Sequence, residues 1–164
     1  MEHPVAAGPI AALEGMPLAV AMRHDLWLYP MVEIVHIFGF VVLVGSIVVL
    51  DLRLLGFSRS ISARALSRHI LPWTFGALVL IVPTGLLMFM AHASDLVDNR
   101  AFQVKLGLIT LAGLNAALFH TGAFRSFAQW DQNVSMPAAV KAHAGASLMI
   151  WAGVISCGRL LAYV

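Results

Sequence analysis

Four long apolar runs, separated by short polar segments, dominate the pattern of hydrophobic and polar positions along this chain. They cover residues 29–56, 70–91, 102–123 and 140–163. A helix needs roughly 20 apolar residues to cross the bilayer core, which is about 30 Å thick. Each run reaches that length, and short connections are usual between antiparallel neighbours in bundles. The pattern therefore predicts an all-α fold, a membrane four-helix bundle that occupies residues 29–164 as one transmembrane domain.

Residues 1–28, ahead of the first run, have a mixed pattern. Glu14, Pro17 and Arg23 interrupt the apolar residues, and no basic stretch precedes them as it would in a signal peptide. The apolar residues of this segment recur at a spacing that lines one side of a helix, as in helices that lie on a membrane surface. We expect a short N-terminal interfacial helix that Pro17 breaks or bends.

The amino-acid composition also indicates a membrane protein. Hydrophobic residues make up 60% of the 164 residues and charged residues 11%, whereas a soluble domain averages about 25% charged residues. The ten Lys and Arg residues cluster at the ends of the runs, so the net charge of +2 does not indicate a nucleic-acid partner. The single cysteine, Cys157, excludes an internal disulfide, and the absence of a Cys-x-x-Cys-His motif excludes covalent c-type haem.

The distribution of basic residues predicts the orientation of the runs. The connection at 53–68 carries four arginines, whereas the connection at 92–100 carries two aspartates and one arginine. The connection at 124–141 has two basic residues and one acid. Because short loops rich in Lys and Arg stay in the cytoplasm, the first and third connections are expected there. Both termini are then expected on the outer side.

Histidines inside the runs or at their ends are the candidate chemistry. One lies well inside the first run, and three lie near the expected cytoplasmic face. Ionisable groups at membrane depth are costly, and they usually face a bundle interior, a cofactor or a water path. Neutral imidazole is a common ligand of haem iron and of transition metals. The candidate haem or metal ligands are therefore His36, His69, His120 and His143.

A porphyrin needs space, so small residues should share the helix face of each ligand. Gly39 follows His36 by three residues, and small residues accompany the other three histidines at helical spacing. Arg68 and Arg125, both on the expected cytoplasmic side, are candidates to pair with haem propionates. Small residues also line ordinary helix contacts in membranes, so the same pattern suits a bundle without a cofactor.

The sequence leaves the ligand pairs open. Three histidines compete for the two axial places near the cytoplasmic face, and a histidine at the end of a run can instead cap a helix. On the outer side the partner of His36 is His92, Met88 or Met90. Met88 and His92 share a helix face, and such soft ligands also suit a copper site that includes His36.

Glu33 lies one turn from His36 on the same helix face. It is a candidate proton acceptor beside a quinol or a cofactor. The competing interpretation is an ion pair with Arg159 or Arg23 at the outer rim. A di-iron site is not indicated, because such a site needs two Glu-x-x-His pairs and the sequence places only one in the spans.

Three motifs carry a family resemblance: WLYPMVEIVHIFGF, GSIVVLDLRLLG and RHILPWTF. From about Trp27 onward, the chain resembles an uncharacterised family of small bacterial four-span inner-membrane proteins. It is also distantly similar to membrane proteins of the copper-resistance D type and to four-helix di-haem cytochromes b. The resemblance implies histidine-bound haem or copper at the four candidate histidines, in a bacterial inner membrane with both termini periplasmic.

These observations predict a membrane haem-b protein for transmembrane or quinol-linked electron transfer, with one or two haems. It would act as a quinol-linked subunit of an oxidoreductase, with the lipid bilayer and a quinone as partners. The alternatives are a copper-binding or copper-transporting membrane protein, and a structural accessory subunit of a larger membrane complex. A homo-oligomer is compatible with each of them. No nucleophile and base pair or phosphate-binding loop supports a hydrolase or a kinase.

Overall fold

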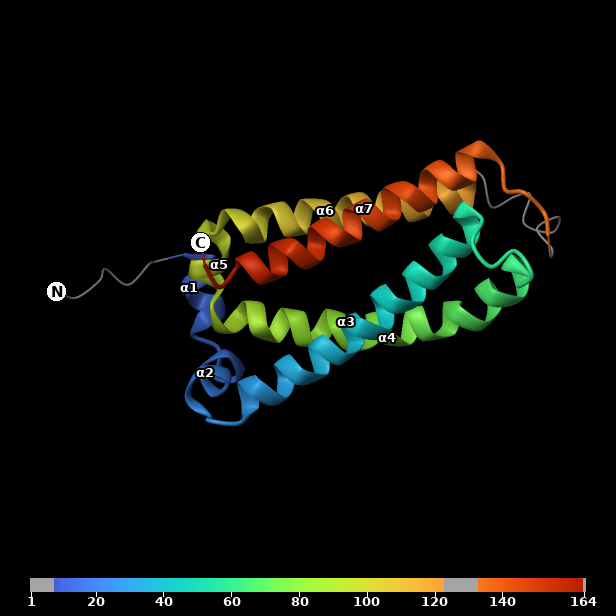
Figure 1. The fold of residues 1–164 in the computed structure, drawn as a ribbon. Helices are drawn as coiled ribbons and strands as arrows, with labels where there is room; N and C mark the ends of the chain where they lie inside the picture. Colours follow the sequence, from blue (N-terminus) through green and yellow to red (C-terminus); the bar gives the residue numbers. More distant parts are fainter. Residues whose placement is uncertain (1–7, 123–132, 164) are drawn as a thin grey trace.

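The chain is built from helices, as the apolar pattern predicts. The computed structural model describes residues 8–122 and 133–163, and within these ranges it contains no strand (Figure 1). The helices are α1 (Pro9–Glu14), α2 (Pro17–His24), α3 (Leu28–Leu55), α4 (Ala63–Ala91), α5 (Ala93–Asp98), α6 (Arg100–Thr121) and α7 (Ala138–Leu160). The predicted all-α class and the short helical segment ahead of the bundle are confirmed.

Four helices, α3, α4, α6 and α7, are long and apolar enough to cross a membrane, and they correspond to the four predicted runs. Much of their outer surface is apolar, with Phe38, Val79 and Met149 exposed by 68, 72 and 77%. Contiguous apolar surface of this kind is unusual on a soluble monomer. The protein is therefore a multi-pass membrane protein whose long helices contact lipid.

Polar capping residues set helix boundaries that hydropathy does not show. Helix α4 begins at Ala63 rather than at residue 70, because the Ser62 hydroxyl accepts a hydrogen bond from the Ala65 amide at 3.3 Å. Helix α6 begins after Asn99, whose side-chain oxygen accepts from the Phe102 amide at 3.0 Å. Each cap satisfies a backbone donor that the first turn leaves unpaired.

The four long helices form two antiparallel hairpins, α3–α4 and α6–α7, which meet mainly where α3 contacts α7 (Figure 1). We call the end that carries the 56–62 loop, with its neighbouring arginines, the basic end. All four long helices contribute to an apolar cluster there, which consists of Leu54, Ala63, Phe119, Met136, Val140 and Ala144. This cluster ties the two hairpins together at the basic end.

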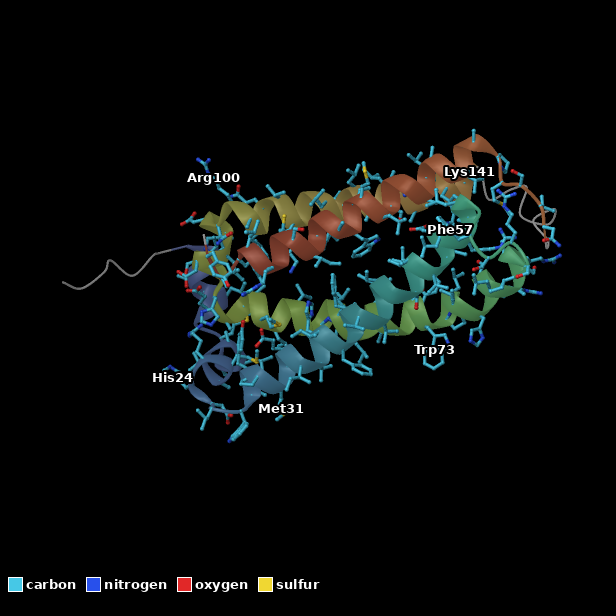
Figure 2. All side chains as sticks on the ribbon, in the orientation of Figure 1. His24, Met31, Phe57, Trp73, Arg100 and Lys141 are labelled. Carbon is cyan, nitrogen blue, oxygen red and sulfur yellow. The ribbon has the colours of Figure 1, made fainter. Side chains whose placement is uncertain are left out.

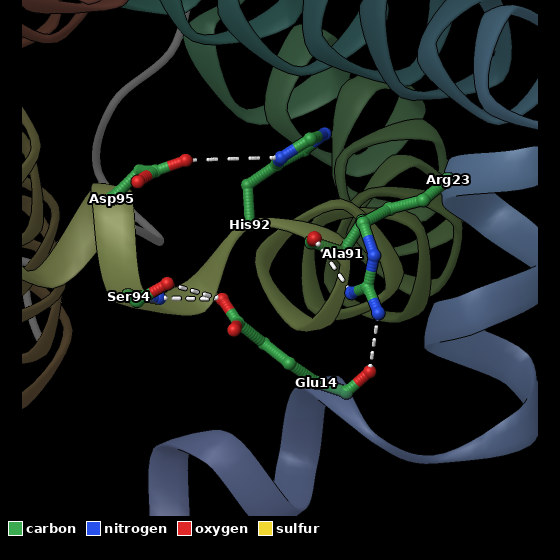
Figure 3. Close-up of polar contacts among 6 residues, drawn as sticks. All are labelled: Glu14, Arg23, Ala91, His92, Ser94 and Asp95. Atoms are coloured by element: carbon green, nitrogen blue, oxygen red, sulfur yellow. Dashed lines mark hydrogen bonds and ion pairs between the residues drawn. The ribbon is translucent and has the colours of Figure 1, made fainter. Parts of the chain in front are cut away.

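The opposite end, which we call the cap end, is covered by α1, α2 and α5 (Figure 1). The Glu14 carboxylate accepts hydrogen bonds from the Ser94 amide at 2.8 Å and the Ser94 hydroxyl at 2.7 Å. Arg23 donates to the Ala91 carbonyl at 3.0 Å and to the Glu14 carbonyl at 2.7 Å (Figure 3). The expected N-terminal helix is thus two short helices on either side of Gly15 and Met16, docked on the junction of α4 and α5.

Hydrogen bonds also act on the two carboxylates of the N-terminal segment. The amide and hydroxyl of Ser94 hold the pKa of the Glu14 carboxyl below its ordinary value. The amides of Trp27 and Leu28, which donate to Asp25 Oδ1 at 2.8 and 2.9 Å, do the same for the pKa of Asp25. Both carboxylates therefore favour their ionised form, in which they accept these bonds.

Candidate histidine sites

His36 is half-buried on α3, in the half of the bundle nearest the cap end. Its Nδ1 lies 3.0 Å from Oγ1 of Thr84 on α4. The Thr84 hydroxyl has one hydrogen, and it donates this hydrogen to the Leu80 carbonyl at 2.6 Å. Oγ1 therefore accepts from His36 Nδ1–H, and the lone pair of the neutral ring lies on Nε2.

The imidazole of His36 packs directly against the backbone of α4. A Cβ atom added at Gly85 would lie 3.1 Å from Cε1 of His36 and 3.6 Å from its Nδ1. Any larger residue at Gly85 would push the ring away from Thr84. Glycine at this position and threonine beside it together set the orientation of the His36 ring.

Gly39 has a different role from the one its spacing suggested. It is buried against α4, and an added Cβ would lie 2.9 Å from Cγ1 of Ile81 and 3.4 Å from Cβ of Leu80. Its small size lets the backbones of α3 and α4 approach closely, which is common in membrane bundles. The structure therefore assigns Gly39 to a helix contact, with no open space in front of it for a porphyrin.

Two charged residues interact electrostatically with the His36 ring. They are Lys105 of α6 and Glu33 of α3. Lys105 is half-buried in the cap-end half of the bundle, with its ammonium directed at Gly158 of α7. Glu33 is exposed, and it forms no ion pair with Arg23 or Arg159 in the described ranges. Arg23 holds the N-terminal helices instead, and Arg159 bonds the Tyr163 hydroxyl on its own segment.

His143 is half-buried on α7 and bonds to Asn115 of α6. The side-chain amide of Asn115 donates to the His143 carbonyl at 3.1 Å, which leaves its Oδ1 to accept from His143 Nδ1–H at 2.7 Å. The neutral ring again carries its lone pair on Nε2. Asn115 thus links α6 to α7, and the histidine is its partner.

His120 and His143 both contact the aromatic ring of Phe119. The Phe119 ring makes edge-to-face contacts with both imidazoles, at centroid distances of 5.5 Å to His120 and 6.0 Å to His143. His120 Nδ1 donates to the Ala116 carbonyl of its own helix at 2.8 Å, and its side chain is exposed. The structure thus brings together two of the three histidines expected at this end.

His69, the third, lies on another surface. It is exposed and lines a shallow groove of about 470 Å³ with Trp73 of α4 and with Gly45 and Val49 of α3. By helical spacing, Val49 lies opposite Phe40, which contacts Trp151 of α7. Figure 2 shows Trp73 projecting away from α6 and α7. His69 therefore faces the lipid side of the α3–α4 pair, away from His120 and His143.

The remaining candidates are peripheral or outside the described ranges. Arg68 is exposed next to His69 on α4. Arg125 lies outside the described residues. His92 follows α4 at the cap end, where its ring packs against Tyr29 and its Nδ1 lies 4.0 Å from Oδ2 of Asp95. In the described part of the chain, no group of three or more His, Cys, Asp or Glu residues is arranged to hold a metal ion.

Sequence reasoning missed Thr84, Gly85 and Lys105. Thr84 and Gly85 directly follow Pro83. Proline has no backbone N–H, so hydrogen bonds in this part of the helix differ from the regular pattern, and this was the available signal. Lys105 carries a plain signal, because a lysine about one and a half turns into a helix that spans a membrane is itself a candidate functional residue.

The chain belongs to a family of unknown function, DUF6644, whose model matches residues 28–164. The match begins one residue after Trp27, where the sequence resemblance was expected to begin, and it leaves out α1 and α2. No curated protein and no solved structure matches the chain.

Proposed function

We propose that this protein is a membrane haem-b protein that transfers electrons between a quinol and a partner across or along the membrane. The observation that carries the proposal is the shared state of His36 and His143. Each imidazole donates Nδ1–H to a residue on a neighbouring helix, so that in the neutral form of either ring the lone pair lies on Nε2. Metal-ligating histidines are usually oriented in this way, by a hydrogen bond from the second ring nitrogen.

The donor set suits haem better than it suits a metal ion bound by protein alone. Haem iron needs one or two axial ligands from the protein, whereas copper sites commonly take three or more. Within the described residues, no cluster of three His, Cys, Asp or Glu side chains that could hold a metal ion occurs. His36 and His143 are therefore proposed as axial ligands, and His120, which shares the Phe119 contact, as a further ligand near His143.

The residues around these histidines would each have a defined task. Thr84 and Asn115 hold the imidazoles in the ligating tautomer. Lys105, whose charge acts on His36, would pair with a carboxylate of the bound group. Glu33 is exposed beside the same site and would accept a proton from a quinol. Bound haem would supply a one-electron redox couple within the apolar bundle.

The proposed setting is a bacterial inner membrane. The arginines at the basic end favour a cytoplasmic location for that end, which would place both termini in the periplasm. A quinone in the bilayer, a larger membrane complex and a second copy of the chain are the proposed partners.

The test is the visible spectrum of the purified protein, recorded as reduced minus oxidised, with metal analysis of the same sample. We expect a b-type band that weakens in His36→Leu and in His143→Leu. His24→Leu, a change at an exposed residue of α2, is the matched control and should keep the band. Copper without haem would favour the copper alternative, and a protein without either would favour the accessory subunit.

The same series decides the role of the third histidine at the basic end. Because His69 faces the lipid side, His69→Leu should retain the full band. Loss of the band in His69→Leu, with His120→Leu unaffected, would contradict the proposed ligand set.

A further inference from the structure

A buried acid near the basic end, Asp51 of α3, is not used by the proposed histidine sites. The residue is only 7% exposed, and it is near in sequence to Leu54 of the apolar cluster and to Leu50, which packs against that cluster. The side chain of Ser147 on α7 forms a hydrogen bond with the Asp51 carboxyl. Ser147 is itself buried, with 9% of the residue exposed. Oδ2 of Asp51 has no hydrogen-bond partner in the described part of the chain.

Within residues 8–122 and 133–163, no positively charged group forms an ion pair with this carboxyl. Arg53, two residues later, donates to the Ile61 and Arg59 carbonyls. The other ionisable residues in this half of the long helices are Arg64, Arg68 and His69 on α4, His120 on α6, and Lys141 and His143 on α7. None of them forms an ion pair with Asp51 within the described ranges.

An ionised carboxylate in such a place would be strongly destabilising. Removing one charge from water is costly even after relaxation, and no ion pair in the described part of the chain offsets this cost. The neutral acid avoids it, and its O–H then occupies the oxygen that lacks a partner. An asparagine at this position could form the same hydrogen bond to Ser147. What an aspartic acid adds is a carboxyl group that can bind and release a proton.

We propose that Asp51 is a proton-binding group inside the bundle. Its carboxylate takes up one proton at Oδ2 and becomes a neutral carboxylic acid, and it returns this proton to water at the basic end. Asp51 lies four residues before Leu55, the last residue of α3, or about 6 Å along the helix axis. Ser147 positions the other oxygen and does not exchange the proton. This inference does not depend on a bound cofactor.

The test is infrared spectroscopy of the whole protein reconstituted in lipid, titrated from acid to alkaline pH in H₂O and in D₂O. We expect the carbonyl band of a protonated carboxyl, separate from carboxylate bands, that shifts in D₂O and disappears as the pH rises. The band should be absent in Asp51→Asn. It should persist at a changed frequency in Ser147→Ala, which keeps the acid and removes its neighbour.

A second measurement covers the case in which Asp51→Asn does not fold. A hydrophobic carbodiimide reacts with protonated carboxyls in apolar surroundings, so it should label Asp51 in the wild-type protein and in Ser147→Ala. Labelling should fall about tenfold per pH unit above the transition, because only the acid form reacts. Asp95→Asn, a change at an exposed residue of α5, is the matched control and should alter neither readout.

Two results would overturn the proposal. One is the absence of a protonated-carboxyl band and of labelling at Asp51 in the wild-type protein. The other is a band that responds neither to pH nor to D₂O, since this would make Asp51 a permanently neutral structural residue.

Discussion

His36 and His143 present the same ring nitrogen to their surroundings but are held by different means. Asn115 bonds His143 at two points, the ring and the backbone carbonyl. Thr84 bonds His36 at the ring only and is itself tied to the Leu80 carbonyl. The His36 ring also lies against Gly85, whereas the His143 ring meets the edge of Phe119. The His36 ring is thus held by close packing together with one hydrogen bond, whereas Asn115 holds His143 through its ring and its backbone carbonyl.

This difference indicates how each site should fail. The site that depends on packing should be sensitive to added volume. The site that depends on hydrogen bonds should be sensitive to the loss of a polar group. Three substitutions test this distinction, and a fourth experiment asks whether the cap end is independent of both sites.

The largest effect is expected from Gly85→Val. A Cβ here would lie 3.1 Å from His36 Cε1, and valine adds two further methyl groups. Overpacking of this kind costs about 1–3 kcal/mol, and it would separate His36 from Thr84. Thermal unfolding in detergent and cofactor content measure the effect. Gly76→Val, on the same helix but with no atom within 4 Å of an added Cβ, is the control and should behave as wild type.

A smaller effect is expected from Asn115→Leu, which removes both bonds to His143. Hydrogen bonds between membrane helices average about 0.6 kcal/mol each, so we expect a loss of about 1 kcal/mol in the free energy of unfolding. The ¹⁵N shifts of the His143 ring should show a mixture of tautomers, while those of His36 stay unchanged. If both rings changed together, the two sites would not be independent.

Thr84→Val should have a weaker effect still, because it removes one interhelical bond and preserves the side-chain shape. We expect a loss of about 0.6 kcal/mol in stability and a loss of about tenfold in cofactor affinity at His36, as is typical when the partner of a ligating histidine is removed. Titration of the purified apoprotein with haem measures the second quantity. An affinity equal to that of the wild type would show that Gly85 alone orients the ring.

The smallest effect is expected from acidification of the cap end. The pKa of Glu14 is lowered in the folded protein by its hydrogen bonds to Ser94. These bonds therefore stabilise the docked N-terminal helices fully when the pH is above the ordinary pKa of a glutamate. This stabilisation is lost as the pH falls through the lowered pKa. Proteolysis at Gly15 and Met16 should then increase, with the ¹⁵N shifts of His143 unchanged.

Two variants complete this last test. Glu14→Gln should remove the pH dependence, and Glu33→Gln, a change at an exposed acid of α3, should preserve it. Equal pH dependence in wild type and Glu14→Gln would assign the effect to another group.

Only some of the residues that form the candidate histidine sites could be predicted from the sequence. The depth of His36 in the first apolar run was enough to make it a candidate site residue. The partners Thr84 and Asn115 lie 48 and 28 residues from their histidines, so no local pattern identifies them. The sequence shows that Gly39 and His69 lie in membrane-spanning helices. It does not show which neighbour each residue faces, because that depends on how each helix is rotated about its axis.

The sequence by itself determined the four spans and the helical class, because the free energy of placing a segment in lipid depends on the composition of that segment. The caps Ser62 and Asn99 were also present in the sequence, although hydropathy did not reveal them. Only the tertiary structure decided which side of α4 carries His69 and which residue orients each imidazole. It also decided that Asp51 is buried with no ion-pair partner among the described residues. These properties depend on the rotation and pairing of helices, which contacts between distant segments determine.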